Sequence, residues 1–409
     1  MAERLTFSER MRAGLDEQLA GVDQELARRY PGERATRQPV HTVYVPADAF
    51  DEAAGPAGIG ALVGDWGRRA LALMDEHGFL PGVDPEVERR VRAKLEREPV
   101  EDLRIDFEDG YGRRSDAEED AAAVRAARLV AAGGTPPFVG VRIKCMEAAV
   151  RARGVRTLDL FLSTLADSGG LPDGLVLTLP KVTYPQQVAA MAALLAEFER
   201  VHGLPEGRLG FEIQIETPQS ILGPDGTATV ARMIDAAAGR ATALHYGTFD
   251  YSASVGVSAA YQSLEHPAAD HAKAVMQVAA AGTGVRLSDG STNVLPVGSA
   301  QQVHAAWELH HRLVRRSLER AYYQGWDMHP GHLPTRYAAV YAFYREGLEP
   351  AAARLAAYVA RQEGDVMDEP ATAKALSGYL LRGLDCGAVD PEEITKASGL
   401  DRAALERLA

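Results

Sequence analysis

Short apolar runs alternate with longer amphipathic segments along most of this chain. The runs predict strands at residues 41–47, 103–109, 138–144, 174–182, 210–217, 241–251, 284–296 and 325–330. The segments between them carry apolar residues at helical spacing, which predicts amphipathic helices. Strands that alternate with helices in this way are typical of βα units and a parallel sheet.

The predicted helices carry their own start and stop signals. Ser115 followed by Glu118 forms a capping box, and that helix closes on Gly133 and Gly134, while a later helix ends at Gly203. Eight strands separated by helices over roughly 300 residues predict a (β/α)8 TIM barrel with insertions. An open doubly wound sheet is the alternative.

The two ends of the chain depart from this alternation. Residues 1–40 predict a helical arm, residues 41–334 the barrel, and residues 335–409 several helices rich in Ala and Leu and separated by Gly and Pro. We expect the last region to be a helical extension that caps the barrel or contacts another subunit.

Three of the predicted strands have one polar face, because alternate residues of a strand point the same way. A solvated edge strand would explain one such case. Three central strands instead favour acids and bases that converge inside one barrel and neutralise one another. The residues on these faces are Arg104, Asp106 and Glu108 in the first strand, Arg142 and Lys144 in the second, and Glu212, Gln214 and Glu216 in the third.

Charged residues gather where several predicted strands end, the position from which TIM-barrel side chains reach the active site. Glu216 and Asp250 have few histidines nearby, which predicts a hard divalent cation with oxygen ligands: Mg²⁺ first, Mn²⁺ second. Zinc is not expected, since neither cysteine has a partner at ligand spacing. The candidate residues are Glu108, Asp109, Arg142, Lys181, Glu216 and Asp250.

Composition narrows the class of protein. The net charge of −13 is spread along the chain, which argues against nucleic acid or anionic lipid as the main partner. No run approaches the roughly 18 apolar residues of a membrane span. Two cysteines are too few for a disulfide framework, and the start of the chain has no apolar signal region, so we expect a cytoplasmic protein.

Seven motifs then occur in order between Val43 and Pro334: VYVPAD, IDFEDGYG, VGVRIK, LTLPKV, IQIETPQSI, YGTFDYSASVG and MHPGHLP. Together they resemble the HpcH/HpaI aldolase and citrate lyase β-subunit superfamily, and GTFDY and HPGHLP are also similar to malate synthases. The resemblance implies a (β/α)8 barrel in which Glu216 and Asp250 bind Mg²⁺ or another divalent ion. It also implies that Arg142 contacts the oxygen that becomes an enolate.

The same resemblance implies a lyase or aldolase that makes or breaks a carbon–carbon bond beside a carbonyl. Its substrate would be a hydroxy-acyl-CoA thioester or a free 4-hydroxy-2-oxo acid, and the chain would form a homo-oligomer, a trimer or hexamer. A 2-oxo acid would chelate the cation, and Arg142 would help to stabilise the negative charge of the enolate. Backbone N–H groups of Gly247, Thr248 and Phe249 would hold the substrate carboxylate.

Several alternatives stay open. Lys181 could form a Schiff base with a ketone, although the surrounding acids should keep it protonated. The barrel could also bind metal and ligand without turnover. His329 is either a proton donor or structural, and Asp289 either a general acid/base or a turn residue. Cys145, which has no adjacent base, is expected to be a packing residue.

Overall fold

A computed structural model describes residues 6–50, 58–360 and 369–409. The described residues form eight strands, all paired in parallel in the order β7-β6-β5-β4-β3-β2-β1-β8. The strands are β1 (His41–Pro46), β2 (Asp102–Asp106), β3 (Phe138–Arg142), β4 (Leu175–Leu179), β5 (Phe211–Ile215), β6 (Ala241–Tyr246), β7 (Arg286–Ser288) and β8 (Gly325–Asp327).

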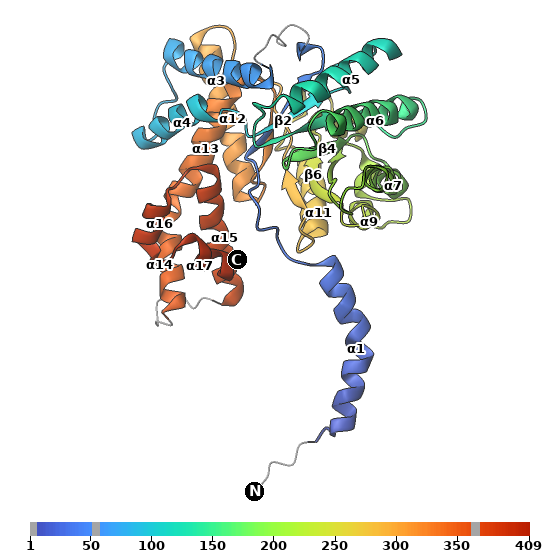
Figure 1. Ribbon diagram of the computed structural model, residues 1–409. Coiled ribbons are helices and arrows are strands. Elements are labelled where there is room, and N and C mark those ends of the chain that lie inside the picture. The colour runs from blue at the N-terminus through green and yellow to red at the C-terminus, as the bar shows by residue number, and fades with distance from the viewer. Residues whose placement is uncertain (1–5, 51–57, 361–368) are drawn as a thin grey trace.

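Backbone hydrogen bonds close this sheet into a barrel. Ser288 forms a parallel bridge with Gln324, the Asp289 N–H donates to the Gln324 carbonyl at 2.8 Å, and the Trp326 N–H donates to the Gly290 carbonyl at 3.3 Å. We call this joint between β7 and β8 the seam. Helices surround the strands (Figure 1), and the predicted TIM barrel is confirmed.

The helices cover the outer face of the barrel and build both ends of the chain. They are α1 (Glu9–Arg29), α3 (Gly58–His77), α4 (Pro85–Arg97), α5 (Asp116–Ala131), α6 (Arg151–Asp167), α7 (Pro185–His202), α8 (Pro218–Ile221), α9 (Thr229–Ala236), α10 (Thr248–Ser254), η1 (Ala259–Tyr261), α11 (Pro267–Ala280), α12 (Ala300–Glu319), η2 (Pro330–His332), α13 (Leu333–Glu346), α14 (Leu348–Val359), α15 (Pro370–Cys386), α16 (Pro391–Ser398) and α17 (Arg402–Leu408).

Local signals in the sequence explain several helix ends. Ser115 and Glu118 make the reciprocal capping box at the start of α5, as predicted. Gly203 ends α7 in the left-handed conformation, with φ of 64°, which glycine adopts without a side-chain penalty.

The apolar core lies between the outer face of the strands and the helices. Val43, Ile105 and Ile213 alternate along their strands with inward-facing polar residues, and all three are fully buried in this core. The alternation therefore puts hydrophobic packing outside the barrel wall and leaves polar side chains inside it.

Charged groups fill the interior of the barrel, as the polar strand faces predicted. Arg104 on β2 pairs with Asp102 and with both oxygens of Glu212 on β5. Thr178 and Tyr44 also donate to Glu212, and all of these residues are buried. This balanced layer satisfies its hydrogen bonds internally, which a buried charge requires.

Several strands are shorter than predicted. The strand expected over 241–251 ends at Tyr246, and α10 begins at Thr248, so Asp250 lies in the first turn of a helix and not at a strand end. The strand expected over 284–296 is only Arg286–Ser288. At these points the chain leaves the barrel wall and forms loops and short helices. The β-propensity of the residues does not predict where a strand ends.

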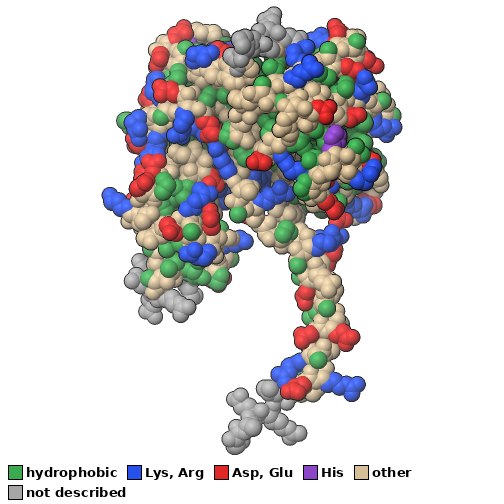
Figure 2. All heavy atoms as spheres, viewed as in Figure 1, with side chains coloured by type: hydrophobic (Ala, Val, Ile, Leu, Met, Phe, Trp, Pro, Cys, Tyr) green, Lys and Arg blue, Asp and Glu red, His purple; other side chains and the backbone are tan. Residues whose placement is uncertain are grey.

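The two ends of the chain extend away from the barrel (Figure 1). Helix α1 projects as a separate arm with no buried residue, and hydrophobic side chains lie among charged ones on its surface (Figure 2). Helix α13 follows the last strand and packs against α12 and α4. Helices α14 to α17 gather beside α13 and share a second apolar cluster that includes Leu348, Leu355, Leu380, Ile394 and Leu405.

None of the described helices combines the length and apolar character that crossing a membrane requires.

Candidate functional site

Acidic side chains from three parts of the chain meet at the carboxyl end of the barrel around Lys181. Its Nζ lies 2.6 Å from Glu108 Oε1, 2.6 Å from Asp109 Oδ2 and 3.9 Å from Asp250 Oδ2. Burial alone would lower the pKa of Lys181, but the bonds to Asp109 and Glu108 hold this pKa well above its ordinary value. Lys181 is therefore a protonated ammonium group that links three carboxylates.

Glu216 is the most deeply placed of these acids. It follows β5 directly, is 1% exposed, and accepts a hydrogen bond of 2.9 Å from the Lys181 backbone N–H. Among the described residues, no cationic side chain lies within ion-pair distance of it. Burial is the main cause that raises the pKa of Glu216 to about 7; Arg142 partly offsets it, and nearby Asp250 and Glu108 act with it.

Arg142, at the end of β3, is held rigidly below the acids. Its Nε and Nη2 donate to the two oxygens of Asp106 at 2.7 Å each, a bidentate pair. Its guanidinium also lies over the rings of Tyr44 and Trp326. Nη1 has only longer contacts, 3.5 Å to Gln214 and 3.6 Å to Glu108, so this nitrogen is the one left for another partner.

The acids fit a hard divalent cation on two observations. Glu216 is a buried carboxylate to which the described residues offer no cationic partner, and ionising it there is unfavourable unless positive charge is supplied. Gly247 makes room beside it, since a Cβ at Gly247 would lie 2.3 Å from Glu216 Cγ. Asp250, whose side chain is 47% exposed, adds a carboxylate at the open side. Carboxylates with space for water are what Mg²⁺ takes in proteins.

The three predicted substrate-binding residues lie where β6 passes into α10. Gly247 gives its N–H to the Ile215 carbonyl at 3.0 Å, so that donor is already used within the sheet. The Thr248 hydroxyl exchanges hydrogen bonds of 3.1 Å with the backbone of Ser291. Thr248 and Phe249 open α10, where the first backbone N–H groups have no partner within the helix.

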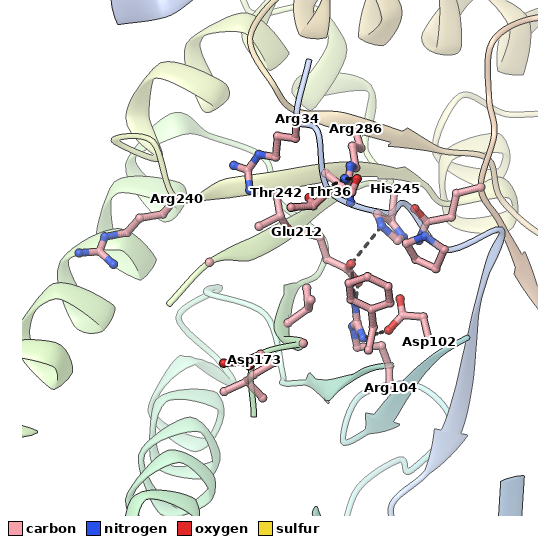
Figure 3. A pocket seen from close by; sticks show the side chains of 18 of the residues that line it. Arg34, Thr36, Asp102, Arg104, Asp173, Glu212, Arg240, Thr242, His245 and Arg286 are labelled. Carbon is pink, nitrogen blue, oxygen red and sulfur yellow. Dashed lines mark hydrogen bonds and ion pairs between the residues drawn. The ribbon is translucent and has the colours of Figure 1, made fainter. Parts of the chain in front are cut away.

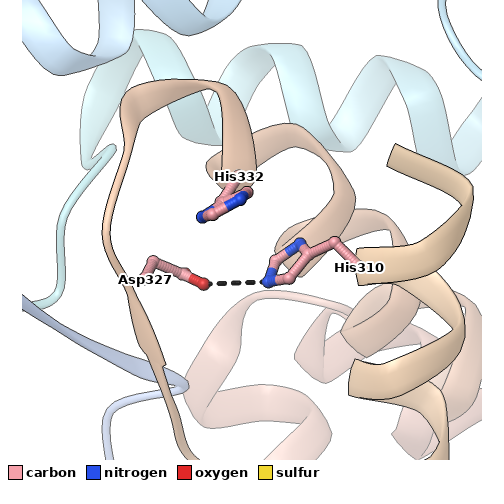
Figure 4. A group of neighbouring side chains, drawn as sticks. All are labelled: His310, Asp327 and His332. Carbon is pink, nitrogen blue, oxygen red and sulfur yellow. Dashed lines mark ion pairs between the residues drawn. The ribbon is translucent and has the colours of Figure 1, made fainter. Parts of the chain in front are cut away.

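A second group of potential metal ligands lies at the end of β8 and consists of His310, Asp327 and His332 (Figure 4). It is the only group of three or more such residues, within the described parts of the chain, whose ligand atoms lie within 4.8 Å of one another. Arg336 already binds both Asp327 oxygens, and His41 and His310 lie 3.0 and 3.1 Å from them. These contacts occupy the carboxylate with protein donors.

The three residues left open by the sequence all have structural contacts. His329 Nδ1 accepts a hydrogen bond of 3.0 Å from the Gly331 N–H, which caps η2. Asp289 is buried and pairs with Lys273 at 3.0 Å. Cys145 is buried, and burial raises the pKa of its thiol, as expected of a packing residue.

Tyr44 and Trp326, whose rings lie under the Arg142 guanidinium, are neighbours of the candidate site that the sequence did not predict. Both lie on strands, β1 and β8, that pair with each other across the first and last parts of the barrel. Alternation along β1 places Tyr44 inward, and this signal is present in the HTVYVPA run. The contact of Trp326 with Arg142 depends on closure of the barrel, which no local pattern records.

Comparisons with known proteins show the family and the fold of this chain. A family model described as "Domain of unknown function (DUF6986)" matches residues 19–409. No protein in the curated collection matches the chain.

Solved structures share the fold. A citrate lyase from Burkholderia xenovorans LB400 superposes with a TM-score of 0.57 at 19% identity, over 88% of this chain and 96% of its own. A Haloferax volcanii malate synthase in a lead(II) complex gives 0.52 at 15% identity, over 75% and 74%. The same enzyme in a magnesium/glyoxylate complex gives 0.51 at 13% identity, over 92% and 99%. At these identities the likeness shows the fold, which is the (β/α)8 barrel that the seven motifs implied.

Proposed function

Since the chain belongs to the DUF6986 family, whose description leaves the activity open, we propose that it is a divalent-metal-dependent carbon–carbon lyase or aldolase. The observation that carries the proposal is the buried Glu216 carboxylate, which has no cationic partner among the described residues and lies against the space left by Gly247. The fold shared with a citrate lyase and malate synthases supports it. Substrates would be hydroxy-acyl-CoA thioesters or 4-hydroxy-2-oxo acids.

In the proposed reaction, Glu216 and Asp250 hold Mg²⁺, or Mn²⁺ in its place. When bound, the cation supplies Lewis-acid polarisation of a 2-oxo acid carbonyl. Arg142 presents Nη1 to the oxygen that becomes the enolate oxygen, while Asp106 fixes the orientation of its guanidinium plane. The Thr248 and Phe249 N–H groups bind the substrate carboxylate.

Glu108, Asp109 and Lys181 are proposed to act as a proton-holding group beside the reacting atoms. Burial raises the pKa of Glu108, whereas the bond to Lys181 lowers that of Asp109 against the effect of its own burial. The two neighbouring carboxyl groups therefore differ in their tendency to hold a proton. Such a difference suits one acid and one base in the same site.

The Schiff-base alternative for Lys181 has less support. An amine must be neutral to attack a ketone, and two ion pairs of 2.6 Å hold Lys181 in its charged form. Borohydride with substrate would trap the imine of such an aldolase, and EDTA would leave its activity unchanged.

Asp250→Ala tests the metal site directly. We expect the variant to fold normally, because the Asp250 side chain is half exposed, and to lose the increase in melting temperature that Mg²⁺ gives the wild type. Asp225→Ala, which removes an exposed surface carboxylate paired with Arg232, is the matched control. Magnesium binding as tight in Asp250→Ala as in the wild type would exclude this residue as a ligand.

Activity is tested by a cleavage screen of hydroxy-acyl-CoA thioesters against free 4-hydroxy-2-oxo acids, with and without EDTA. We expect turnover that EDTA abolishes and that Arg142→Lys lowers at least about tenfold, since lysine keeps the charge but loses the planar fork. Metal or ligand binding without turnover of either class would favour the non-catalytic alternative.

We further propose that the chain forms a homo-oligomer through α1. Seven large apolar residues, 47–64% exposed, recur every three or four positions along this arm: Phe7, Met11, Leu15, Leu19, Val22, Leu26 and Tyr30. That spacing gathers them on one helix face. Pairing with a second copy of this face would bury roughly 600 Å² per chain, which reaches the lower end of specific interfaces at roughly 1,200 Å² in total.

Light scattering after size exclusion tests this assembly. Leu15→Glu combined with Leu19→Glu should lower the measured mass, while Gln24→Glu on the opposite face of α1 should leave it unchanged. A monomeric wild type would overturn the proposal. The predicted trimer or hexamer would appear in the same measurement.

We also propose that the protein works in the cytoplasm. The support is that both cysteines, Cys145 and Cys386, are buried free thiols. Fractionation of the native cells would test this location.

A further inference from the structure

A cavity of about 230 Å³ opens at the amino-terminal end of the barrel, opposite the candidate catalytic site (Figure 3). Its wall includes the starts of β4, β5 and β6, and residues 34–39 form another part of it. Deep in the cavity lie Asp102, Arg104 and Glu212 of the balanced layer, together with His245, whose Nε2 is 3.0 Å from Glu212. A cavity of this volume can hold a small polyatomic ion.

Arg34 and Arg286 lie on one side of this cavity and come from distant parts of the chain (Figure 3). A Cβ on Gly284, two residues before Arg286, would lie 3.6 Å from Arg34 Cγ and 3.8 Å from its Nε. Burial and then the charge of Arg34 reduce the pKa of Arg286 to about 10, and burial also reduces the pKa of Arg34. The backbone two residues before Arg286 thus lies beside the Arg34 side chain, and the two like charges repel each other.

Neither guanidinium has an acidic partner within ion-pair distance among the described residues. Arg34 donates only to the Ala241 carbonyl, at 3.0 Å. Arg286 donates to the Arg37 carbonyl at 2.7 Å and to the carbonyl and hydroxyl of Thr36. Among the described residues, no atom accepts a hydrogen bond from Nε of Arg286. The same holds for Nε and Nη1 of Arg34. Arg286 is half-buried and Arg34 is more exposed, and a charge partly removed from water normally finds a counter-charge.

The carboxylates that line the cavity do not supply that counter-charge. Glu212 already accepts from Arg104, Thr178 and Tyr44, and Asp102 accepts from Arg104 and Thr42. Asp173 is fully exposed at the rim. Glu33 and Asp385, whose charges also reach Arg286, already pair with Arg382 and Arg402. A negative group in the space beside Arg34 and Arg286 would therefore meet unmatched positive charge.

The lining also contains an unpaired hydroxyl. Thr242 Oγ1 is buried and has no hydrogen-bond partner within the described chain. A hydroxyl in that position can donate to an oxyanion and would otherwise remain unsatisfied, at a cost in stability.

We propose that this cavity binds a phosphate-sized oxyanion between Arg34 and Arg286, with Thr242 donating a hydrogen bond to it. The anion supplies the counter-charge that the two guanidinium groups lack. Because Arg34 and Thr36 belong to the segment that crosses the open end of the barrel, the bound anion also ties that segment to β6 and β7.

The test is a titration of the full-length protein with sodium phosphate at constant ionic strength, followed by thermal melting. We expect a saturable rise in melting temperature for the wild type. Arg34→Gln should weaken the apparent phosphate affinity at least about tenfold, because hydrogen bonds to charged groups are the strong ones. Thr242→Val should weaken it roughly threefold or more.

Two control variants distinguish this site from a general effect of net charge and from phosphate bound elsewhere on the protein. Arg200→Gln removes an exposed arginine that pairs only with Glu197, so it changes the net charge equally and should keep the response. Lys181→Gln alters the opposite end of the barrel and should keep it too, which excludes phosphate bound at the candidate catalytic site.

Three results would overturn the proposal: an equal rise with sodium chloride alone, no saturable response in the wild type, or an unchanged phosphate affinity in Arg34→Gln. Should Arg34→Gln fail to fold, which circular dichroism would reveal, Arg34→Lys and Thr242→Val carry the same comparison.

Discussion

Glu212 and Glu216 lie on the same face of one strand segment, four residues apart, and both are buried, yet their surroundings differ in charge. Around Glu212, burial would raise the pKa of the carboxyl, but Arg104 and His245 hold it well below its usual range. Around Glu216, burial acts together with Asp250 and Glu108, and the pKa rises to about 7.

The difference teaches how to separate structural charges from functional ones in this barrel. The layer around Glu212 contains its own counter-charges and hydrogen bonds, so nothing further has to bind there. The layer around Glu216 has more acid than base, so its ionised state needs an added cation. Perturbed groups of the second kind are the ones that mark candidate sites.

The largest expected effect comes from breaking the balanced layer. Glu212→Ala leaves Arg104 with only part of its counter-charge and leaves His245 without its acidic neighbour at 3.0 Å. Removing one partner of a buried ion pair typically costs about 3–5 kcal/mol in the free energy of unfolding. Urea unfolding measures this loss. A cost below about 1 kcal/mol would show that the layer is not a structural network.

Glu216→Gln should have the opposite effect when metal is absent. The folded pKa of Glu216, about 7, exceeds its unfolded value, so its stabilising contribution is present below pH 4.5 and is lost as the pH rises through 7. In EDTA, the variant should therefore gain on the wild type by up to about 3 kcal/mol between pH 5 and 8. Chemical unfolding at the two pH values measures this gain.

The same two proteins are then compared with Mg²⁺ present. At pH 8 it should stabilise the wild type and leave Glu216→Gln unchanged, because the amide cannot supply the negative charge that the cation needs. Parallel pH dependence of the two proteins without metal would contradict the assignment of the raised pKa to Glu216.

Gly247→Ala should disturb only the layer around Glu216, by a steric clash and not by a change of charge. The added methyl group would lie 2.3 Å from Glu216 Cγ, and φ at this position is −97°, so the backbone itself allows alanine. We expect about 1–2 kcal/mol of destabilisation from overpacking and a weaker response to Mg²⁺. The same melting series measures both. Gly207→Ala, which has open space around its Cβ but a positive φ, shows the cost of backbone strain for comparison.

Tyr44→Phe should produce the smallest change. It removes one hydroxyl that donates to Glu212 at 3.1 Å and accepts from Gln214 at 3.3 Å, while Arg104 still pairs with Glu212. A loss of about 1 kcal/mol in the free energy of unfolding is expected. A loss as large as that of Glu212→Ala would mean that the hydroxyl, and not the ion pair, organises the layer.

Much of the barrel could be predicted because apolar and polar residues alternate along its strands. Residues such as Ile105 and Ile213 point outward to the helices, and Arg104 and Glu212 point inward, at the period of two that a strand requires. Glu108, Asp109 and Glu216 follow the ends of β2 and β5, so their places along the chain also predicted them. Contacts between distant residues were harder to predict from the sequence. Arg142 and Trp326, for example, are in contact but lie far apart along the chain.

The position of Asp250 shows where local reasoning failed. Aromatic residues Phe249 and Tyr251 extend the strand-like pattern, but the chain has already left the barrel wall at Gly247 and begun α10. Strand β6 ends where its hydrogen bonds to β5 end, and the last paired residues are Ile215 and Tyr246. That is tertiary information, which overrides β-propensity.

The segment before β1 has a consequence for how the chain folds. Gln38 donates to the Leu287 carbonyl and to Gln324, contacts that span 249 and 286 residues, and it does so at the seam, where strand pairing is thinnest. The beginning of the chain therefore cannot complete its contacts until the last strand has been made. Contacts this distant in sequence slow folding, because the loop must close before they can form. During synthesis the barrel would remain an open, curved sheet until residues 324–327 have emerged from the ribosome and can pair at the seam.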